Sequence, residues 1–310
     1  MNQNLEYLGM TFATPLINAA GTVKYKEEFQ RLLETDLGAI VIGSITVSSR
    51  DGNEGTTWHP DGINSLGMPN PGLGYYIDNL PEMVKEAHDN DKKVIVSIAG
   101  FNAKEYVNLA GVAFKCGADI VEINFGCPNV LDGGTAKPIY SFDIPNMVGV
   151  INEIKNAFRG TLDDKLNNLL IKLSPYSDPD QLKYAISTID HVLPKGGYTI
   201  SNTFPKGFIF DEHLNPAITP DGGLGGISGQ MFKPIALGQV KQVKKILSEK
   251  NSSKIIVGAG GIATGRDMLE FSKVGASLMQ IGTAFLRSNR PEIFSEILLE
   301  YSELVGEKVS

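Results

Sequence analysis

An amide, a thiol and a Pro-Asn turn follow one another at residues 124–129, where the sequence is Asn-Phe-Gly-Cys-Pro-Asn. The preceding residues, Ile120-Val-Glu-Ile123, form an apolar-rich run that is typical of a buried strand. Enzymes with α/β folds place their chemistry in polar groups at the carboxyl ends of such strands. Cys127 at this position could serve as a general base, provided that its thiolate is accessible.

The composition of the chain limits the partners that need to be considered. The 310-residue chain has a net charge of −7, with 42% hydrophobic and 20% charged residues, which is ordinary for a globular protein with a large core. No block of Lys and Arg occurs, so nucleic acids and anionic membrane surfaces are disfavoured as partners. No apolar run approaches the roughly 18 residues that span a bilayer, and the first residues do not resemble a signal peptide.

The cysteines and histidines of the chain are few and scattered. The 2 cysteines, Cys116 and Cys127, provide neither a disulfide framework nor a zinc-binding pattern. No pair of the 4 histidines has the spacing of metal ligands. We therefore expect a cytoplasmic protein without a metal site.

Short apolar runs alternate with longer amphipathic segments along the whole chain. This alternation favours an α/β protein with a (β/α)8 TIM-barrel fold, and a doubly wound open sheet is the alternative. No linker or low-complexity segment divides the chain, so we expect residues 1–310 to form a single domain. The predicted strands are 15–18, 39–43, 94–98, 120–124, 170–173, 199–202, 255–258 and 278–282. The predicted helices include 103–116, 144–158, 178–190, 233–248 and 266–274.

Polar residues stand at the carboxyl ends of these strands, which a barrel brings together on one face. Asn18, Asn124 and Asn202 would offer donors and acceptors suited to a flat heterocycle with imide edges. Lys172 lies between two apolar residues of its strand, and a buried lysine is costly unless an acceptor or an anion meets it. That partner is either a ligand or a structural carboxylate.

Glycine-rich turns follow the last two predicted strands, at Gly258-Ala-Gly-Gly261 and at Gly282-Thr283. Bare backbone amides in such turns can hold a phosphate group, and barrels often bind phosphate at this place. A phosphate site, a buried lysine and a thiol base together suggest an enzyme that uses flavin mononucleotide (FMN). The lysine would stabilise negative charge on one edge of the reduced flavin.

Two long connections, 44–79 and 203–230, are rich in Gly, Pro and Asn. Loops of this length within a compact domain are usually functional or mobile. We expect the first connection, together with the loop at 130–137 that follows the cysteine, to cover the site. The second of these loops contains Asp132-Gly-Gly-Thr-Ala136 and would move to admit substrate.

The chain resembles the dihydroorotate dehydrogenases over nearly its whole length, and most closely the soluble class 1A, whose base is a cysteine and whose acceptor is fumarate. The resemblance implies FMN-dependent oxidation of dihydroorotate to orotate in pyrimidine biosynthesis, and it implies a homodimer. A related class passes electrons to NAD through a partner subunit. The motifs that carry the resemblance are Asn18-Ala-Ala-Gly21, Arg50-Asp-Gly-Asn53, Asn64-Ser-Leu-Gly-Met-Pro-Asn70, Ser97-Ile-Ala-Gly100, Asn124-Phe-Gly-Cys-Pro-Asn129, Lys172-Leu-Ser-Pro175, Asn202-Thr203, Gly222-Gly-Leu-Gly-Gly226, Gly258-Ala-Gly-Gly261 and Gln280-Ile-Gly-Thr283.

The resemblance also implies roles for individual residues. Cys127 would take the C5 proton of dihydroorotate, while a hydride passes from C6 to the flavin N5. The residues implied to contact the substrate are Asn64, Leu66, Gly67, Met68, Asn124, Asn202 and Thr203. The residues implied to contact FMN are Ala20, Gly21, Gly43, Ser44, Asn124, Lys172, Gly225, Gly260, Gly261, Gly282 and Thr283.

Gly43 departs from the family pattern, which has a lysine here that touches both the flavin and the substrate carboxylate. A buried carboxylate without a cationic partner binds poorly. Three hypotheses follow. In the first, dihydroorotate is the substrate and another cation, Lys24 or else Lys26 or Lys137, replaces the lysine. In the second, the substrate is a different dihydropyrimidine, for example a neutral one. In the third, the chain is a flavin-binding or ligand-binding barrel with little or no activity.

Overall fold

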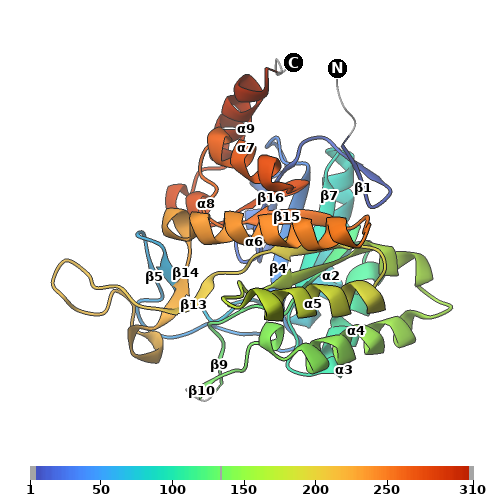
Figure 1. The fold of residues 1–310 in the computed structure, drawn as a ribbon, viewed down its shortest axis with the longest axis horizontal. Coiled ribbons are helices and arrows are strands. Elements are labelled where there is room, and N and C mark those ends of the chain that lie inside the picture. The colour runs from blue at the N-terminus through green and yellow to red at the C-terminus, as the bar shows by residue number, and fades with distance from the viewer. Residues whose placement is uncertain (1–4, 133–134, 307–310) are drawn as a thin grey trace.

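Eight parallel strands close into a barrel in a computed structural model of the chain, which describes residues 5–132 and 135–306 (Figure 1). The strands follow one another around the barrel in sequence order, and β16 pairs with β3 to close it. The (β/α)8 prediction is therefore confirmed, and the open-sheet alternative is wrong. The barrel strands are β3 (Leu16–Asn18), β4 (Ala39–Ile45), β7 (Lys93–Ile98), β8 (Ile120–Asn124), β11 (Leu169–Leu173), β12 (Gly197–Ile200), β15 (Ile255–Ala259) and β16 (Leu278–Ile281).

The barrel strands are mostly apolar because both of their faces are covered. Every residue of β4, β8, β11 and β15 is buried. Strands that are buried on both faces form continuous runs of Val, Ile and Leu, which is why the sequence located them to within about two residues. Strand β4 extends two residues further than predicted, so Ser44 lies within the strand.

Helices cover the outside of the barrel, and α3, α4, α5 and α7 begin at side-chain caps. Asn102, Asp143, Asp178 and Thr264 each accept a backbone N–H in the first turn of the helix that follows. The outer helices are α2 (Leu73–Asp89), α3 (Ala103–Lys115), α4 (Ile144–Phe158), α5 (Pro179–Val192), α6 (Gly229–Glu249), α7 (Gly265–Val274) and α9 (Glu292–Val305), and α1 (Lys26–Gln30) and α8 (Thr283–Ser288) are short. Helix α6 begins one turn earlier than the predicted 233–248.

The two long connections are more structured than the sequence predicted. Together they form an antiparallel sheet of four short strands in the order β13-β14-β6-β5, and α2 already begins at Leu73. The first connection is therefore shorter than the predicted 44–79, because β4 runs to Ile45 and α2 begins at Leu73. The strands of this accessory sheet are β5 (Trp58–His59), β6 (Ile63–Asn64), β13 (Phe204–Gly207) and β14 (Gly225–Ile227).

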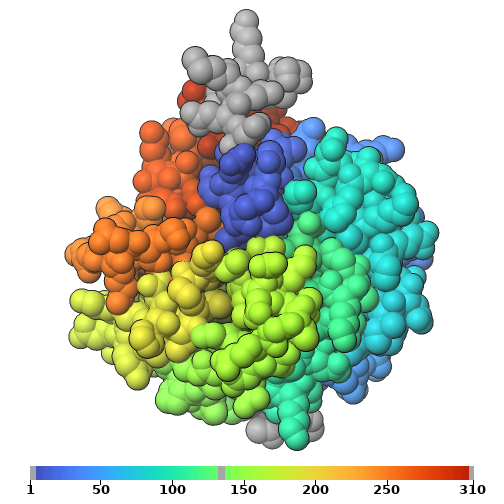
Figure 2. Space-filling view, turned by 90° about the vertical axis from the view of Figure 1, so that its right-hand side faces the viewer, coloured from blue at the N-terminus to red at the C-terminus, as the bar shows by residue number. Residues whose placement is uncertain are grey.

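The opposite end of the barrel is closed by an amino-terminal hairpin of β1 (Leu5–Tyr7) and β2 (Met10–Phe12). Phe12 packs in one buried cluster with Ile17, Val41 and other strand residues, so the hairpin seals the barrel interior from below. Figure 2 shows this blue segment between the orange and cyan parts of the chain. Ligands therefore have to enter from the end that carries the accessory sheet.

A second small hairpin follows the cysteine segment. It consists of β9 (Leu131–Asp132) and β10 (Thr135–Ala136), and the two glycines between them lie outside the described residues. The predicted covering loop at 130–137 is thus described only at its two arms. The remaining elements are short 3₁₀ segments at Tyr140–Phe142, Asp163–Asn168 and Pro220–Gly223. Among the described residues, no helix combines the length and the apolar character that crossing a bilayer requires.

Candidate active site

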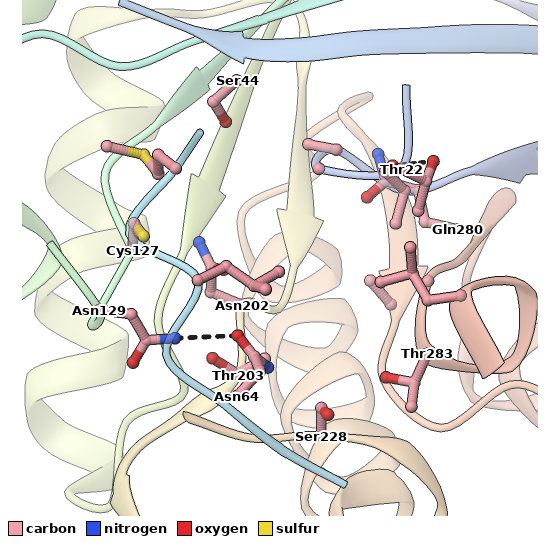
Figure 3. Close-up of a pocket in the computed structure, with 18 of the residues that line it drawn as sticks. Thr22, Ser44, Asn64, Cys127, Asn129, Asn202, Thr203, Ser228, Gln280 and Thr283 are labelled. Atoms are coloured by element: carbon pink, nitrogen blue, oxygen red, sulfur yellow. Dashed lines mark hydrogen bonds between the residues drawn. The ribbon is translucent and has the colours of Figure 1, made fainter. Parts of the chain in front are cut away.

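A pocket opens at the carboxyl ends of the barrel strands, beneath the accessory sheet (Figure 3). Its empty space, counted with the part that is open to solvent, is about 1110 Å³. The sequence-predicted residues that line it are Ala20, Gly21, Ser44, Asn64, Leu66, Gly67, Met68, Asn124, Cys127, Lys172, Asn202, Thr203, Gly260, Gly261, Gly282 and Thr283.

Two predicted contacts, Gly225 and Gly43, do not line the pocket. Gly225 lies in β14, where an added Cβ would stand 2.6 Å from the backbone oxygen of Asn64. The close approach of the accessory-sheet strands is by itself enough to require glycine there. A contact between Gly225 and the cofactor therefore stays a prediction.

Three asparagines form one side of the pocket, and we call Asn64, Asn124 and Asn202 the asparagine cluster. The Asn124 side chain at the end of β8 donates from Nδ2 to Ser44 Oγ at 2.9 Å and accepts from Asn202 Nδ2 at 2.8 Å. The hydroxyl of Thr203 lies next to them, buried and without a hydrogen-bond partner among the described residues. A planar polar ligand could satisfy this hydroxyl, because an unpaired buried hydroxyl is costly.

Asn129 is a pocket residue to which the sequence had assigned no role. Its Nδ2 donates to Asn64 Oδ1 at 3.0 Å, and Figure 3 shows both side chains beside Cys127 and Asn202. The signal was present in the Pro-Asn turn after the cysteine, since such a turn brings the asparagine back toward the strand end. Asn129 thereby fixes the donor and acceptor pattern that Asn64 presents to a ligand.

The thiol of Cys127 lies at the wall of the pocket, partly exposed to it. Burial raises the pKa of Cys127 above its ordinary value, while a hydrogen bond from the Asn129 backbone and the positive charges of Lys137, Lys172 and Arg50 lower it in part. Because burial dominates, the thiol holds its proton at neutral pH. A base at this position therefore becomes more effective as the pH rises.

Lys172 projects from β11 into the far side of the pocket, where it is almost completely buried. Its Nζ donates to Gln280 Oε1 at 3.0 Å and lies 3.4 Å from Glu122 Oε1. The two partners expected for this lysine, a ligand and a structural carboxylate, are therefore compatible, because it lines the pocket and also has Glu122 beside it. Gln280, which the sequence analysis did not single out as a ligand contact, lines the pocket as well.

Three backbone segments converge at the deep end of the pocket, and we call Ser228, Gly229, Gly260, Gly261, Gly282 and Thr283 the phosphate end. An added Cβ on Gly261 would stand 2.5 Å from the Gly229 oxygen, and one on Gly229 would stand 3.4 Å from Thr283 Cγ2. Ser228 precedes the 21-residue helix α6, and its buried Oγ has no partner among the described residues. A helix start, glycine amides and an unsatisfied hydroxyl fit the phosphate group of FMN.

Gly43 leaves no room for the lysine that the family pattern has there. Its φ is +101°, and an added Cβ would stand 2.5 Å from the Ser97 backbone oxygen. Its backbone N–H donates to Val23 O at 2.9 Å, so the segment that follows β3 runs directly beside it. The next residue of that segment, Lys24, lines the pocket.

Of the three lysines considered as replacements, only Lys24 is among the residues that line the pocket. Lys26 points to α2, where its Nζ lies 2.7 Å from Glu82 Oε2. Lys137 donates to the Gly100 backbone oxygen at 2.6 Å and lies over the Phe101 ring. Within residues 5–132 and 135–306 the Lys24 ammonium has no ion-pair partner, so it is available to an anionic ligand.

Comparison with known proteins identifies the family of this chain. A family model of dihydroorotate dehydrogenase matches residues 3–305. The chain belongs to the dihydroorotate dehydrogenase family. A putative dihydroorotate dehydrogenase A (fumarate) of Streptococcus agalactiae is 33% identical over 310 residues, which cover 98% of this chain and 93% of that relative. The dihydroorotate dehydrogenase A (fumarate) of Lactococcus lactis subsp. cremoris is 30% identical over 311 residues, which cover 98% and 94%.

A solved structure supports the same fold. The ligand-free dihydroorotate dehydrogenase of Eimeria tenella superposes with a TM-score of 0.78 over 96% of this chain and 86% of that chain, at 20% identity. At this level of identity the likeness concerns the barrel alone. The family assignment rests on the family model and on the bacterial relatives, and the site residues rest on the geometry described above.

Proposed function

We propose that this protein is an FMN-dependent dihydroorotate dehydrogenase that oxidises dihydroorotate to orotate in pyrimidine biosynthesis. Membership of the family makes it an oxidoreductase that acts on a CH–CH group. The observation that carries the proposal is the meeting of Cys127, the asparagine cluster and Lys172 in one pocket that also contains the phosphate end. We further propose a single domain over residues 1–310, a homodimer, and fumarate or another small molecule as the final electron acceptor.

The residues of the pocket divide the reaction between them. Bound FMN would supply the acceptor for the hydride that leaves C6. The thiolate form of Cys127 takes up the C5 proton on Sγ and becomes the thiol, so that the C5–C6 double bond forms as proton and hydride depart. The asparagine cluster and Thr203 hold the pyrimidine ring in its plane. The backbone of residues 66–68 lines the space for the substrate carboxylate.

Lys24 is proposed as the cation that meets this carboxylate. The support is its place in the pocket lining and the pairing of the preceding Val23 with Gly43, which sets it beside the position of the missing lysine. A carboxylate in a site shielded from water needs such a partner, since an unpaired buried charge costs several kcal/mol. Lys172 has Glu122 beside it and is assigned to the flavin side.

A neutral dihydropyrimidine is the second candidate substrate, and the observation that favours it is Gly43 itself. The anaerobic bleaching of bound flavin by dihydroorotate and by dihydrouracil separates the two. We expect a yellow protein that dihydroorotate bleaches much faster than dihydrouracil does. Bleaching by dihydrouracil alone would establish the second candidate, and a colourless protein that takes up no FMN would contradict both.

The pH dependence of bleaching should follow the titration of Cys127. Burial raises the pKa of this thiol. The rate constant of bleaching should therefore increase with pH, and the midpoint of this increase should lie above the ordinary pKa of a cysteine. Lys137→Met removes a positive charge that lowers this pKa, so the midpoint should move to higher pH. Stopped-flow measurements across the pH range test this, with Lys115→Met on α3 as the control. A midpoint that moves to lower pH in Lys137→Met would contradict the assignment.

A further inference from the structure

Glu122, in the middle of β8, is a buried carboxylate for which the proposed reaction has no use. Its side chain is 0% exposed inside the barrel, below the floor of the pocket. Oε1 accepts from Ser97 Oγ at 3.0 Å and lies 3.4 Å from Lys172 Nζ. Oε2 accepts from Thr199 Oγ1 at 2.8 Å and from Gln280 Nε2 at 2.7 Å. Four groups able to donate thus surround two acceptor oxygens, which is the environment of an ionised carboxylate.

One path from Glu122 leads to the cofactor side of the pocket. Gln280 accepts a hydrogen bond from Lys172 Nζ at its Oε1 and donates one from its Nε2 to Glu122. Since Glu122 also lies beside Lys172, the three side chains form a closed triangle. The triangle fixes the ammonium in place. It also sets a negative charge directly beneath the positive one, which reduces the positive potential that Lys172 presents to a ligand.

A second path leads to the substrate side and has a fixed direction. Ser97 donates its hydroxyl hydrogen to Glu122, so it has to accept from Ser44, whose Oγ is 2.9 Å away. Ser44 in turn accepts from Asn124 Nδ2. At the other end, the Gly126 N–H donates to Asn124 Oδ1 at 3.1 Å. This series of hydrogen bonds therefore runs from Glu122, which accepts, to the Gly126 N–H, which can only donate. As a result, only one orientation of the Asn124 side-chain amide satisfies its hydrogen bonds.

We propose that Glu122 is a positioning residue that adjusts both halves of the active site at once. Through Gln280 it holds Lys172 and moderates its charge at the flavin. Through Ser97 and Ser44 it orients Asn124, whose Oδ1 accepts from Asn202 in the asparagine cluster. The inference rests on the proposed function, because it takes the flavin and pyrimidine sides of the pocket as assigned above.

The cofactor half is tested by the flavin midpoint potential of Glu122→Gln, measured against a reference dye. The substitution keeps the shape of the side chain but removes the negative charge beneath Lys172. The positive potential at the flavin then increases and favours the electron-rich reduced form. We expect the midpoint potential to rise by about 30 mV or more, which is a tenfold change in a two-electron equilibrium.

The substrate half is tested by orotate binding to Ser97→Ala, followed through the flavin absorbance. This substitution cuts the second path and leaves the triangle with Lys172 intact. The Ser44 hydroxyl then lacks its acceptor, and we expect orotate affinity to fall by about fivefold or more, with the midpoint potential unchanged. Thr199→Val is the matched control, because it removes a donor to Glu122 that belongs to neither path, and it should change neither quantity.

The outcomes separate this inference from the proposed function. An unchanged potential in Glu122→Gln or unchanged orotate affinity in Ser97→Ala would overturn the inference, as would Thr199→Val shifting the potential as far as Glu122→Gln does. The potential needs only bound flavin, so it decides the cofactor half even if the unmodified protein oxidises another dihydropyrimidine. Absence of flavin from the unmodified protein would overturn the inference together with the proposed function.

Discussion

Replacing Cys127 with alanine is expected to slow the bleaching of bound flavin by dihydroorotate by about two or more orders of magnitude, with flavin binding preserved. The thiol lies at the wall of the pocket near the asparagine cluster, and it is removed from the phosphate end that would hold the cofactor (Figure 3). Apart from Lys24 and Lys172, it is the one titratable side chain among the described residues that line the pocket. Loss of the thiol therefore removes the proposed acceptor of the C5 proton.

The measurement is anaerobic stopped-flow at the absorbance band of the oxidised flavin, with Cys116→Ala as the matched control. Cys116 ends helix α3 on the outside of the barrel and does not line the pocket. Cys127→Ser should retain more activity than Cys127→Ala, because a hydroxyl can still take part in proton transfer. Equal bleaching rates in the unmodified protein and in Cys127→Ala would mean that the base lies elsewhere.

Replacing Lys24 with methionine should raise the KM for dihydroorotate by about 30-fold or more. The expectation follows from the loss of about 2–5 kcal/mol when one partner of a desolvated charge pair is removed, since each 1.4 kcal/mol corresponds to about a factor of ten. Methionine preserves most of the side-chain volume, so the pocket should keep its shape. Any turnover of dihydrouracil, which has no carboxylate, should change little.

Lys26→Met is the matched control for Lys24→Met. Lys26 lies two residues further along and forms ion pairs with Glu82 and Glu86, so its loss should leave the KM for dihydroorotate unchanged. An unchanged KM in Lys24→Met would remove Lys24 as the substrate cation. Gly43→Lys should not rescue Lys24→Met, because the positive φ of Gly43 and the nearby Ser97 oxygen exclude a side chain there.

The barrel could be predicted from the sequence because its strands are continuous apolar runs, which differ clearly from the amphipathic helices between them. The accessory sheet could not. Strands β5 and β6 have two residues each, too few for an alternation of apolar and polar positions to be recognised. Helix α2 was partly concealed for a related reason, since Gly74 and Pro81 interrupt its helical pattern.

The site was predictable where a residue stands at a strand end, and less so where its role depends on a distant partner. Cys127, Asn124 and Lys172 belong to the first group, since strand position alone places them in the pocket. The role of Glu122 belongs to the second, because the donors around it come from β7, β11, β12 and β16. Ser228 had a local signal, a serine directly before a helix, but only the structure reveals that its hydroxyl is unsatisfied.

The backbone pairing of Val23 with Gly43 has a consequence for how relatives of this protein should be compared. Neighbouring strand ends of a barrel lie within one side-chain length of each other, so a charge lost from one end can be restored from the next. An alignment column would then record a missing residue while the pocket still contains the charge. To decide whether such a chain retains its substrate, the charges around the ligand in the folded proteins should be compared, and not single alignment columns.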